Sequence, residues 1–460
     1  MKKQCEMLLH IPPRMWHRFR EAMLEARFAN EEVIGFFFCT RHQVSKSKIR
    51  FLPKAWVVPD PDCYERQSAG GLALKQQFHL YLLQTYVNNG LDVVHIHTHP
   101  GHGIPRFSYT DDEHESRYAK FLSSSFEGTP RLISGVFDEL LEHSSFRIWD
   151  KDGQSVDSSL KFCNSSVEAS TSQDIDSWEN ALIFDRQRVF GDRVQKQLGE
   201  LSVGLIGCGG IGSVFAEVLS RLGVRKWVLI DPDRLEETNL NRMPSATYKM
   251  AKGKWYKVRY VKELIKRMYP RGSYVRAMPV SIQDDKAKRE IASCDLIVVG
   301  TDNHISRQIA QEIALKYMRP LLCLGTYIEA RPKESHPRMY CRITLPPLDG
   351  GWCLMCGNII NLQRAALESS PQDITEIAAR AGYIEGVADP AVFWLNSICA
   401  SKGVGVIHGM LSGFLNLDSG IDWVYDFPGE NWLKTNTQHL GSPTCYFCSI
   451  EGEYLCSPDL

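Results

Sequence analysis

Two histidines, a serine and an aspartate in the first third of the chain have the spacing of a metal site. His97 and His99 stand where a predicted strand runs out into a loop, and Ser108 and Asp111 follow that loop. Two imidazoles and one carboxylate would leave the fourth tetrahedral position of a zinc ion to water, which is the arrangement of a catalytic site. Water bound there reaches a pKa of about 7 and becomes a nucleophile, provided that a nearby carboxylate accepts its proton.

A glycine-rich turn in the second half of the chain could bind phosphate. It follows a predicted strand and opens a predicted helix, so its backbone can approach a phosphate at the helix N-terminus. Its glycines are Gly207, Gly209, Gly210 and Gly212. Asp231 ends the next predicted strand, where its carboxylate could bond a ribose hydroxyl. By themselves these residues fit a nicotinamide dinucleotide equally well.

Charged residues further along favour a nucleoside triphosphate over a dinucleotide. Arg242 and Lys257 can neutralise triphosphate charge, and Asp302 can hold magnesium against the phosphates. A nicotinamide enzyme has no use for that set. Lys254 lies close enough in the sequence to compete with Lys257 for this role. We therefore expect ATP and Mg²⁺ at this site.

Four late cysteines form two Cys-x-x-Cys pairs, Cys353 with Cys356 and Cys445 with Cys448. Two such pairs supply four thiolates and make a closed tetrahedral site, so we expect a structural zinc here and a catalytic zinc at the histidines. In a reducing compartment, clustered cysteines are metal ligands or catalytic thiols rather than disulfides.

The pattern of elements divides the chain into two domains. Short β-rich runs alternate with helical patterns from about residue 36 to residue 149, which indicates an α+β domain over residues 1–152. Residues 153–178 are rich in serine and acidic side chains, which is typical of a linker.

The second domain is expected over residues 179–460. Buried-strand runs at 201–206, 227–230 and 295–299 alternate with helical patterns. That alternation predicts a parallel, doubly wound sheet of the Rossmann type, so the chain as a whole is placed in the α/β class.

Composition excludes several classes of protein. The 460 residues are 43% apolar and 23% charged, as in ordinary globular proteins. Lysine plus arginine (53) nearly equals aspartate plus glutamate (54), so we expect neither nucleic acid nor an anionic membrane as partner. The first residues lack a signal-peptide pattern and no run of 18 apolar residues occurs, so a cytoplasmic location is expected.

The first site resembles the JAMM (JAB/MPN) metallopeptidases, whose signature is His-Ser/Thr-His-Pro, a short loop and Ser-x-x-Asp. The resemblance covers roughly residues 10 to 150, with a loop one residue longer than the family spacing. It implies a JAB/MPN fold and isopeptidase activity. By the same resemblance His97, His99 and Asp111 would bind zinc, and Ser108 would stabilise the oxyanion.

The JAMM resemblance also implies a general base. In that family it is a glutamate on an early strand, just before a run of glycine and hydrophobic residues. Glu32 precedes such a run, Val33–Phe36, and is assigned this role, with Glu31 as the alternative.

From about residue 180 to residue 450 the chain resembles the ThiF/MoeB/E1 superfamily, which adenylates the C-terminal glycine of ubiquitin-like or sulfur-carrier proteins. The matching elements are Asp-x-Asp (Asp231, Asp233), Asn-Leu-x-Arg (Asn239, Arg242), the glycine-preceded lysine (Lys257) and Thr-Asp-Asn (Asp302). In that family an arginine before the glycine motif reaches the partner protomer's ATP site. Arg186 matches it and implies a homodimer with composite sites.

The chain departs from those superfamily members that form a thioester. They place a cysteine between the first zinc pair and a late Gly-Val-x-x-Pro motif, here Gly386–Pro390. Residues 357–398 contain no cysteine. Cys341, Cys399 and Cys456 lie outside that interval, and the apolar helical context of Cys399 is typical of a core residue.

Three functional hypotheses follow. In a bacterial ubiquitin-like conjugation pathway, the peptidase would process or remove the modifier, the second domain would adenylate it, and a separate E2-like protein would receive it. In a biosynthetic pathway, the chain would activate a sulfur carrier without a thioester. The third hypothesis is a non-catalytic scaffold for ubiquitin-like folds. The fused peptidase favours the first, the missing cysteine favours the second, and the intact metal and nucleotide residues disfavour the third.

Overall fold

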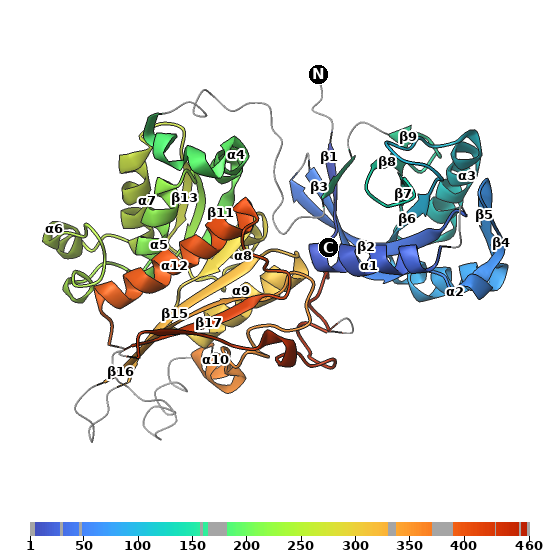
Figure 1. Cartoon of the computed structure of the whole chain (residues 1–460). Helices are drawn as coiled ribbons and strands as arrows, with labels where there is room; N and C mark the ends of the chain where they lie inside the picture. The colour runs from blue at the N-terminus through green and yellow to red at the C-terminus, as the bar shows by residue number, and fades with distance from the viewer. Residues whose placement is uncertain are drawn as a thin grey trace. The chain divides into compact units, whose positions relative to one another are not determined.

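A computed structural model describes residues 5–27, 31–45, 48–156, 160–163, 182–329, 337–369, 390–427, 429–449 and 452–457. The chain forms two compact units (Figure 1). The first comprises Met1–Ser165 with Leu455–Leu460, and the second comprises Ser166–Tyr454. Each has its own mixed α/β architecture.

An eight-stranded sheet, in the order β10-β1-β3-β2-β6-β7-β8-β9, organises the first unit. Its strands are β1 (Glu6–His10), β2 (Ile34–Ser45), β3 (Lys48–Val57), β6 (Asp92–Thr98), β7 (Leu132–Phe137), β8 (Ser144–Trp149), β9 (Ser155–Val156) and β10 (Leu160–Cys163). β4 (Tyr64–Ser68) and β5 (Gly71–Leu74) form a separate hairpin. The helices are α1 (Pro13–Glu25), α2 (Gln76–Thr85), α3 (Tyr109–Ser125) and the short 3-10 turns η1 (Pro61–Cys63) and η2 (Val87–Asn89).

Alternate residues of the strands are buried on opposite faces of this sheet, and helices cover both faces. Successive strand residues point to opposite faces. On β2, Phe37 packs into the core that includes Phe19 of α1, whereas Phe36 and Phe38 pack into the core that includes Leu122 of α3. Both faces of the strand are thus buried, which accounts for its continuous apolar sequence.

β9 and β10 fall within residues 153–178, for which the sequence predicted a linker. β10 pairs in parallel with β1 and extends the sheet at that edge. The other residues of the predicted linker after Val156, at 157–159 and 164–178, lie outside the described part of the chain.

A second eight-stranded sheet, in the order β13-β12-β11-β14-β15-β16-β17-β18, organises the second unit. Its strands are β11 (Ser202–Ile206), β12 (Lys226–Ile230), β13 (Tyr274–Met278), β14 (Leu296–Val299), β15 (Leu321–Glu329), β16 (Arg338–Leu345), β17 (Ile421–Phe427) and β18 (Asn431–Lys434). The helices are η4 (Leu182–Phe190), α4 (Asp192–Glu200), α5 (Gly210–Arg221), η5 (Glu237–Asn239), α6 (Tyr248–Lys252), α7 (Lys257–Met268), α8 (Asp285–Ala292), α9 (His304–Lys316), α10 (Leu362–Glu368), α12 (Phe393–Ser412) and η6 (Thr437–His439).

The expected Rossmann-like parallel sheet is present in five strands, β13 to β15 in the sheet order. The sequence did not predict that β16, β17 and β18 continue it in antiparallel fashion. Both faces are covered: Leu205 of β11 packs into the core that includes α5, α7 and α12, and Ile206 packs into the core that includes α8 and α9. Chain order reverses between β11 and β14, and ligands bind at the carboxyl ends of strands at such a switch point.

Candidate functional site

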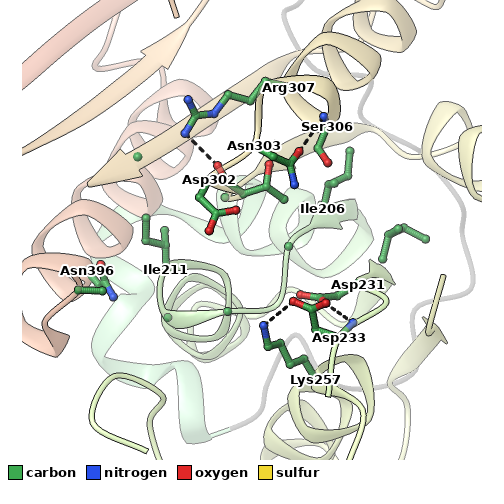
Figure 2. A pocket seen from close by; sticks show the side chains of 18 of the residues that line it. Ile206, Ile211, Asp231, Asp233, Lys257, Asp302, Asn303, Ser306, Arg307 and Asn396 are labelled. Atoms are coloured by element: carbon green, nitrogen blue, oxygen red, sulfur yellow. Dashed lines mark hydrogen bonds and ion pairs between the residues drawn. The ribbon is translucent and has the colours of Figure 1, made fainter. Parts of the chain in front are cut away.

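A pocket of about 270 Å³ opens at this switch point (Figure 2). Of the residues predicted to bind nucleotide, those that line it are Gly207, Gly209, Gly210, Asp231, Asp233, Arg242, Lys257 and Asp302. They follow β11, β12 and β14, begin α5 and α7, or, for Arg242, follow η5, so separate stretches of sequence meet at one edge of the sheet. The pocket therefore combines a helix N-terminus with cations and carboxylates.

The glycines of the turn are required by close backbone approach. Gly207 has a φ of +91°, and a Cβ there would stand 2.8 Å from the methyl of Thr301. A Cβ on Gly212 would stand 1.9 Å from the Gly207 carbonyl oxygen. Gly212 is not among the residues that line the pocket. It allows α5 to start directly above the turn, so that the helix N-terminus faces the pocket.

The acidic pair after β12 lies beside the glycine turn. The Asp231 carboxylate accepts hydrogen bonds from Cys208 N at 2.7 Å and from Asp233 N at 2.8 Å, and burial raises its pKa. Lys257 donates to Asp233 at 2.7 Å. Lys254 instead pairs with Glu236 at 3.3 Å and is not among the lining residues, so the geometry favours Lys257 as the nucleotide-site lysine.

Sequence reasoning missed five polar residues that line the pocket, Ser281, Ser306, Arg307, Thr326 and Asn396. Arg307 donates to the Thr301 carbonyl at 2.9 Å, and Thr326 donates to Asn396 Oδ1 at 2.9 Å. The Asn396 amide nitrogen lies beside the glycine turn, because a Cβ on Gly210 would be 2.4 Å from it. Asn396 comes from α12, far along the chain from the glycine turn, and no local motif marks it.

Two other predicted nucleotide-site residues lie outside this pocket. Asn239 is buried in η5, where its side chain accepts from Glu236 N at 3.1 Å and thereby caps the turn. Arg186 lies exposed on η4, and it is not among the pocket's lining residues.

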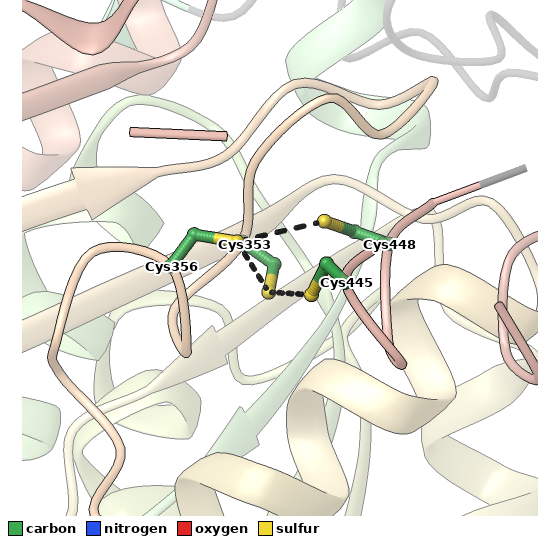
Figure 3. Close-up of side chains that lie close together, drawn as sticks. All are labelled: Cys353, Cys356, Cys445 and Cys448. Carbon is green, nitrogen blue, oxygen red and sulfur yellow. Dashed lines mark hydrogen bonds between the residues drawn. The ribbon is translucent and has the colours of Figure 1, made fainter. Parts of the chain in front are cut away.

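The four late cysteines converge (Figure 3). Sγ–Sγ distances are 3.8 Å for Cys353–Cys356, 4.0 Å for Cys353–Cys445 and 3.8 Å for Cys356–Cys448. Sulfurs bound at about 2.3 Å to a tetrahedral zinc lie about 3.8 Å apart, so the set fits that ion. Hydrogen bonds from Cys353 and Cys448 lower the pKa of the Cys356 thiol, whereas hydrogen bonds within the cluster raise the pKa of the Cys353 and Cys448 thiols, so one thiolate is favoured in the metal-free cluster.

The other metal-ligand candidates also converge, at the carboxyl end of β6 and the start of α3. His97 Nε2 lies 3.2 Å from His99 Nε2 and 3.4 Å from Asp111 Oδ1, and His99 Nε2 lies 3.5 Å from Asp111 Oδ2. Ligands at about 2.0–2.1 Å from a tetrahedral zinc are about 3.3–3.4 Å apart, so this set fits the ion too. The extra residue in the preceding loop does not displace Asp111 from the histidines.

Two of the three candidate ligands, His97 and Asp111, favour the protonation state that binds a metal, whereas the hydrogen bond with Asp111 raises the pKa of His99. Burial lowers the pKa of His97, which favours the neutral imidazole. Burial raises the pKa of Asp111, but hydrogen bonds from His97 and His99 outweigh it and hold the carboxyl well below its usual range. A neutral imidazole and an ionised carboxylate are the forms that bind a cation.

Strand pairing brings Glu32 to the same place. Ile34 of β2 is in register with His97, and Thr98 N donates to the Val33 carbonyl at 3.0 Å, so Glu32 lies beside the end of β6. Burial raises the pKa of the Glu32 carboxyl; the nearby His99 opposes the shift, and Asp111 adds to it. A carboxyl with a raised pKa is better suited to accept a proton.

Ser108 is the N-cap of α3. Its hydroxyl accepts from Asp111 N at 3.2 Å, while the Asp111 carboxylate accepts from Ser108 N at 2.6 Å. This reciprocal capping box fixes the first turn of the helix. A hydroxyl that accepts one hydrogen bond still carries a proton that it can donate to a ligand.

The cysteines considered for a thioester are poorly placed for one. Cys399 and Cys456 are both fully buried. The Cys341 thiol and burial together raise the pKa of Cys399, which suits a core residue rather than a nucleophile. The predicted Gly-Val-x-x-Pro motif lies outside the described residues except for Pro390, which lines the nucleotide pocket.

Comparison with known families assigns part of the chain. Residues 184–356 match the ThiF family model. The chain carries a ThiF family domain. That match contains the glycine turn, the acidic pair, Lys257 and Asp302, and it ends at Cys356 of the first zinc pair.

Curated relatives match part of the chain. Sulfur carrier protein ThiS adenylyltransferase of Bacillus subtilis (strain 168) is 28% identical over 185 residues, which are 38% of this chain and 54% of the relative. Ubiquitin-like modifier-activating enzyme 5 of Caenorhabditis briggsae is 35% identical over 77 residues, 17% of this chain and 18% of the relative. The match thus spans about half of the first relative and less than a fifth of the second.

Among solved structures, the crystal structure of E. coli MccB with ATP is 20% identical to this chain, with a TM-score of 0.45. The alignment covers 60% of this chain and 76% of that one.

In the described part of the chain, no helix has the length and apolar character needed to cross a bilayer.

Proposed function

We propose that the chain adenylates the C-terminal glycine of a ubiquitin-like or sulfur-carrier protein with ATP, and that its first unit is a JAMM-type zinc peptidase acting on the same protein. The observation that carries the first part is the pocket at the switch point, in which a helix N-terminus, three cations and Asp302 converge, all of them within the stretch that matches the ThiF family. The names of the relatives, a sulfur-carrier adenylyltransferase and a ubiquitin-like-modifier-activating enzyme, support it.

In the adenylation step the carrier's terminal carboxylate attacks the α-phosphorus of ATP. An acyl–phosphate bond forms and the bond to pyrophosphate breaks. The N-terminus of α5 would receive the phosphates, and Arg242 and Lys257 would neutralise their charge. Asp231 would hold the ribose, and Asp302 would hold magnesium, which supplies charge neutralisation on the leaving pyrophosphate.

In the peptidase, His97, His99 and Asp111 would hold zinc, which supplies an acidified water when bound. Glu32 would accept that water's proton and then donate it to the leaving amine. The Ser108 hydroxyl would donate to the oxyanion of the tetrahedral intermediate. The mutual distances of the ligand atoms and the placement of Glu32 beside His99 support this assignment.

Two pathways are compatible with this chemistry. A bacterial ubiquitin-like conjugation pathway with a separate E2-like protein is favoured by the peptidase, since removal of conjugated modifiers needs an isopeptidase. Sulfur-carrier activation is the second candidate, and the lack of cysteine in residues 357–398 favours it. Intact ligand and nucleotide residues disfavour a non-catalytic scaffold.

ATP–pyrophosphate exchange tests the proposed function. The full-length protein is supplied with candidate small proteins that end in Gly-Gly, and exchange is expected only with the cognate carrier. A gel for a covalent adduct then separates conjugation from sulfur transfer, because a thioester adduct is released by hydroxylamine as well as by thiol, whereas adenylation alone leaves no covalent adduct on the enzyme. No exchange with any such protein would contradict the adenylation proposal.

We further propose a homodimer in which Arg186 completes the partner's ATP site. η4 carries Arg186 between side chains that are apolar and exposed, such as Leu182 (83% exposed) and Val189 (84%). A solvent-exposed apolar segment of this kind is typical of a protein interface.

Mixed dimers test this arrangement. Arg186→Ala and Lys257→Ala are each expected to lose exchange. Mixing the two should restore about one quarter of wild-type activity, because half of the dimers are mixed and each has one intact composite site. Exchange activity is measured against the mixing ratio. No recovery, with dimers verified by light scattering, would contradict composite sites.

Loss of the cysteine cluster should lower stability rather than remove a reacting group. Cys445→Ser is expected to bind one zinc fewer per chain and to melt at a lower temperature, because a closed zinc site contributes directly to folding. Elemental analysis and thermal melting measure both effects. Cys63→Ser, at a half-buried cysteine outside the cluster, is the control. Unchanged zinc content in Cys445→Ser would contradict the assignment.

A further inference from the structure

A buried charged cluster lies behind the candidate zinc ligands. Glu115 of α3 and Arg147 of β8 are 3% and 5% exposed. Glu115 Oε2 accepts from Arg147 Nε at 2.8 Å, from Arg147 Nη2 at 2.5 Å and from Trp149 Nε1 at 3.1 Å, and Oε1 faces His95 Nε2 at 2.9 Å. Both carboxylate oxygens are therefore engaged.

Arg147 also contacts the segment that carries Ser108. Its guanidinium lies 3.7 Å from the centre of the Phe107 ring and 4.6 Å from that of Trp149. Its Nη1 forms an ion pair with Asp112 on the first turn of α3. One side chain of β8 thus holds the residue before the α3 N-cap and two carboxylates of α3.

The positions of Asp112 and Glu115 on α3 mean that their contact with Arg147 also affects Asp111. Asp111 and Glu115 are four residues apart and lie on the same face of α3. Asp112, next to Asp111, binds the same guanidinium. Fixing Asp112 and Glu115 therefore fixes the rotation of the helix about its axis, and with it the direction in which Asp111 points.

Stability alone is a weak explanation for such a cluster. Burying an ion pair costs desolvation energy that often offsets the attraction between the charges, and apolar replacements of similar volume can be equally stable. A planar guanidinium that forms two or more directed hydrogen bonds, by contrast, fixes geometry well.

We propose that Arg147 is the positioning residue of the metal site: by holding Asp112, Glu115 and the Phe107 ring, it aims Asp111 at His97 and His99. This inference rests on the proposed zinc peptidase. Arg147 acts through α3 and touches neither metal nor substrate.

Zinc affinity of the full-length protein tests the inference. Arg147→Ala is expected to weaken zinc binding at this site about 10- to 100-fold, the scale for residues that orient metal ligands. Arg147→Lys keeps the positive charge but lacks the planar guanidinium, and its zinc affinity should lie between those of the wild type and Arg147→Ala. Affinity is measured by competition with a chromophoric chelator, and the phase that His97→Ala loses identifies this site.

A matched pair on the same helix provides the control. Arg117 pairs with Glu113 at 2.5 Å, but both side chains are exposed, and Arg117→Ala should keep wild-type zinc affinity. Melting of the metal-free variants is recorded in parallel. If Arg147→Ala does not fold, the zinc affinities of Arg147→Lys and Glu115→Gln test the inference instead. Unchanged zinc affinity in the folded variants, whatever their melting temperatures, overturns the inference, whereas a wild-type protein without this zinc overturns the proposed peptidase instead.

Discussion

Asp302→Ala is expected to abolish carrier-dependent ATP–pyrophosphate exchange while leaving peptidase activity near that of wild type. Asp302 lies exposed between β14 and α9 and lines the nucleotide pocket. Asp302 would hold the magnesium ion, which would neutralise charge on the departing pyrophosphate, and the alanine variant would lack this ligand. Removing one group that stabilises transition-state charge lowers the rate about 10²- to 10³-fold, so the exchange rate should fall by at least about 10²-fold. Radiolabelled pyrophosphate incorporation measures it.

Asp285→Ala controls for the loss of a negative charge. Asp285 lies in the first turn of α8, where its side chain is 79% exposed and pairs with Lys288. It is not among the lining residues, so its replacement should leave exchange unchanged. Exchange by Asp302→Ala that equals that of Asp285→Ala would remove Asp302 from the mechanism. Loss of carrier hydrolysis in Asp302→Ala would show that the variant perturbs more than the nucleotide site.

The convergence of these residues at the switch-point pocket was largely predictable because the main groups follow strands that the sequence marks clearly. Gly207 and Asp231 come directly after buried-strand runs, and parallel strands place their carboxyl ends at one edge. Asn396 and Thr326 were not predictable. They reach the pocket from α12 and β15, and their contact depends on the tertiary packing of α12 rather than on a local pattern.

In the first unit, too, local spacing was predictable and long-range pairing was not. The histidines share one strand and Asp111 follows a capping serine, so short-range spacing predicted their convergence. Arg147 and Glu115 were not singled out, because their pairing joins β8 to α3 across 32 residues. The strands β9, β10 and β18 were missed because they are short, with two to four residues each. β16 and β17 are longer, and β16 buries alternate residues, but a local pattern does not give the antiparallel direction in which they pair.

Glu32→Gln should separate proton transfer from metal binding in the peptidase. Glutamine keeps the size and approximate hydrogen-bonding shape of glutamate but cannot accept the water's proton. Zinc content should therefore stay at the wild-type level while hydrolysis of a carrier extended past its terminal glycine falls by about 10²-fold or more, the usual scale for a general base. Elemental analysis and a cleavage assay on the full-length protein measure the two quantities.

Two comparisons make this result specific. His97→Ala should lose one zinc per chain together with the activity, because three protein ligands hold a catalytic zinc. Glu31→Gln alters the adjacent carboxylate, and it should hydrolyse the carrier as wild type does, because burial and the proximity to His99 distinguish Glu32. If Glu31→Gln were inactive and Glu32→Gln fully active, the base would be Glu31. If all three variants kept zinc and activity, hydrolysis would come from elsewhere and the JAMM assignment would fail.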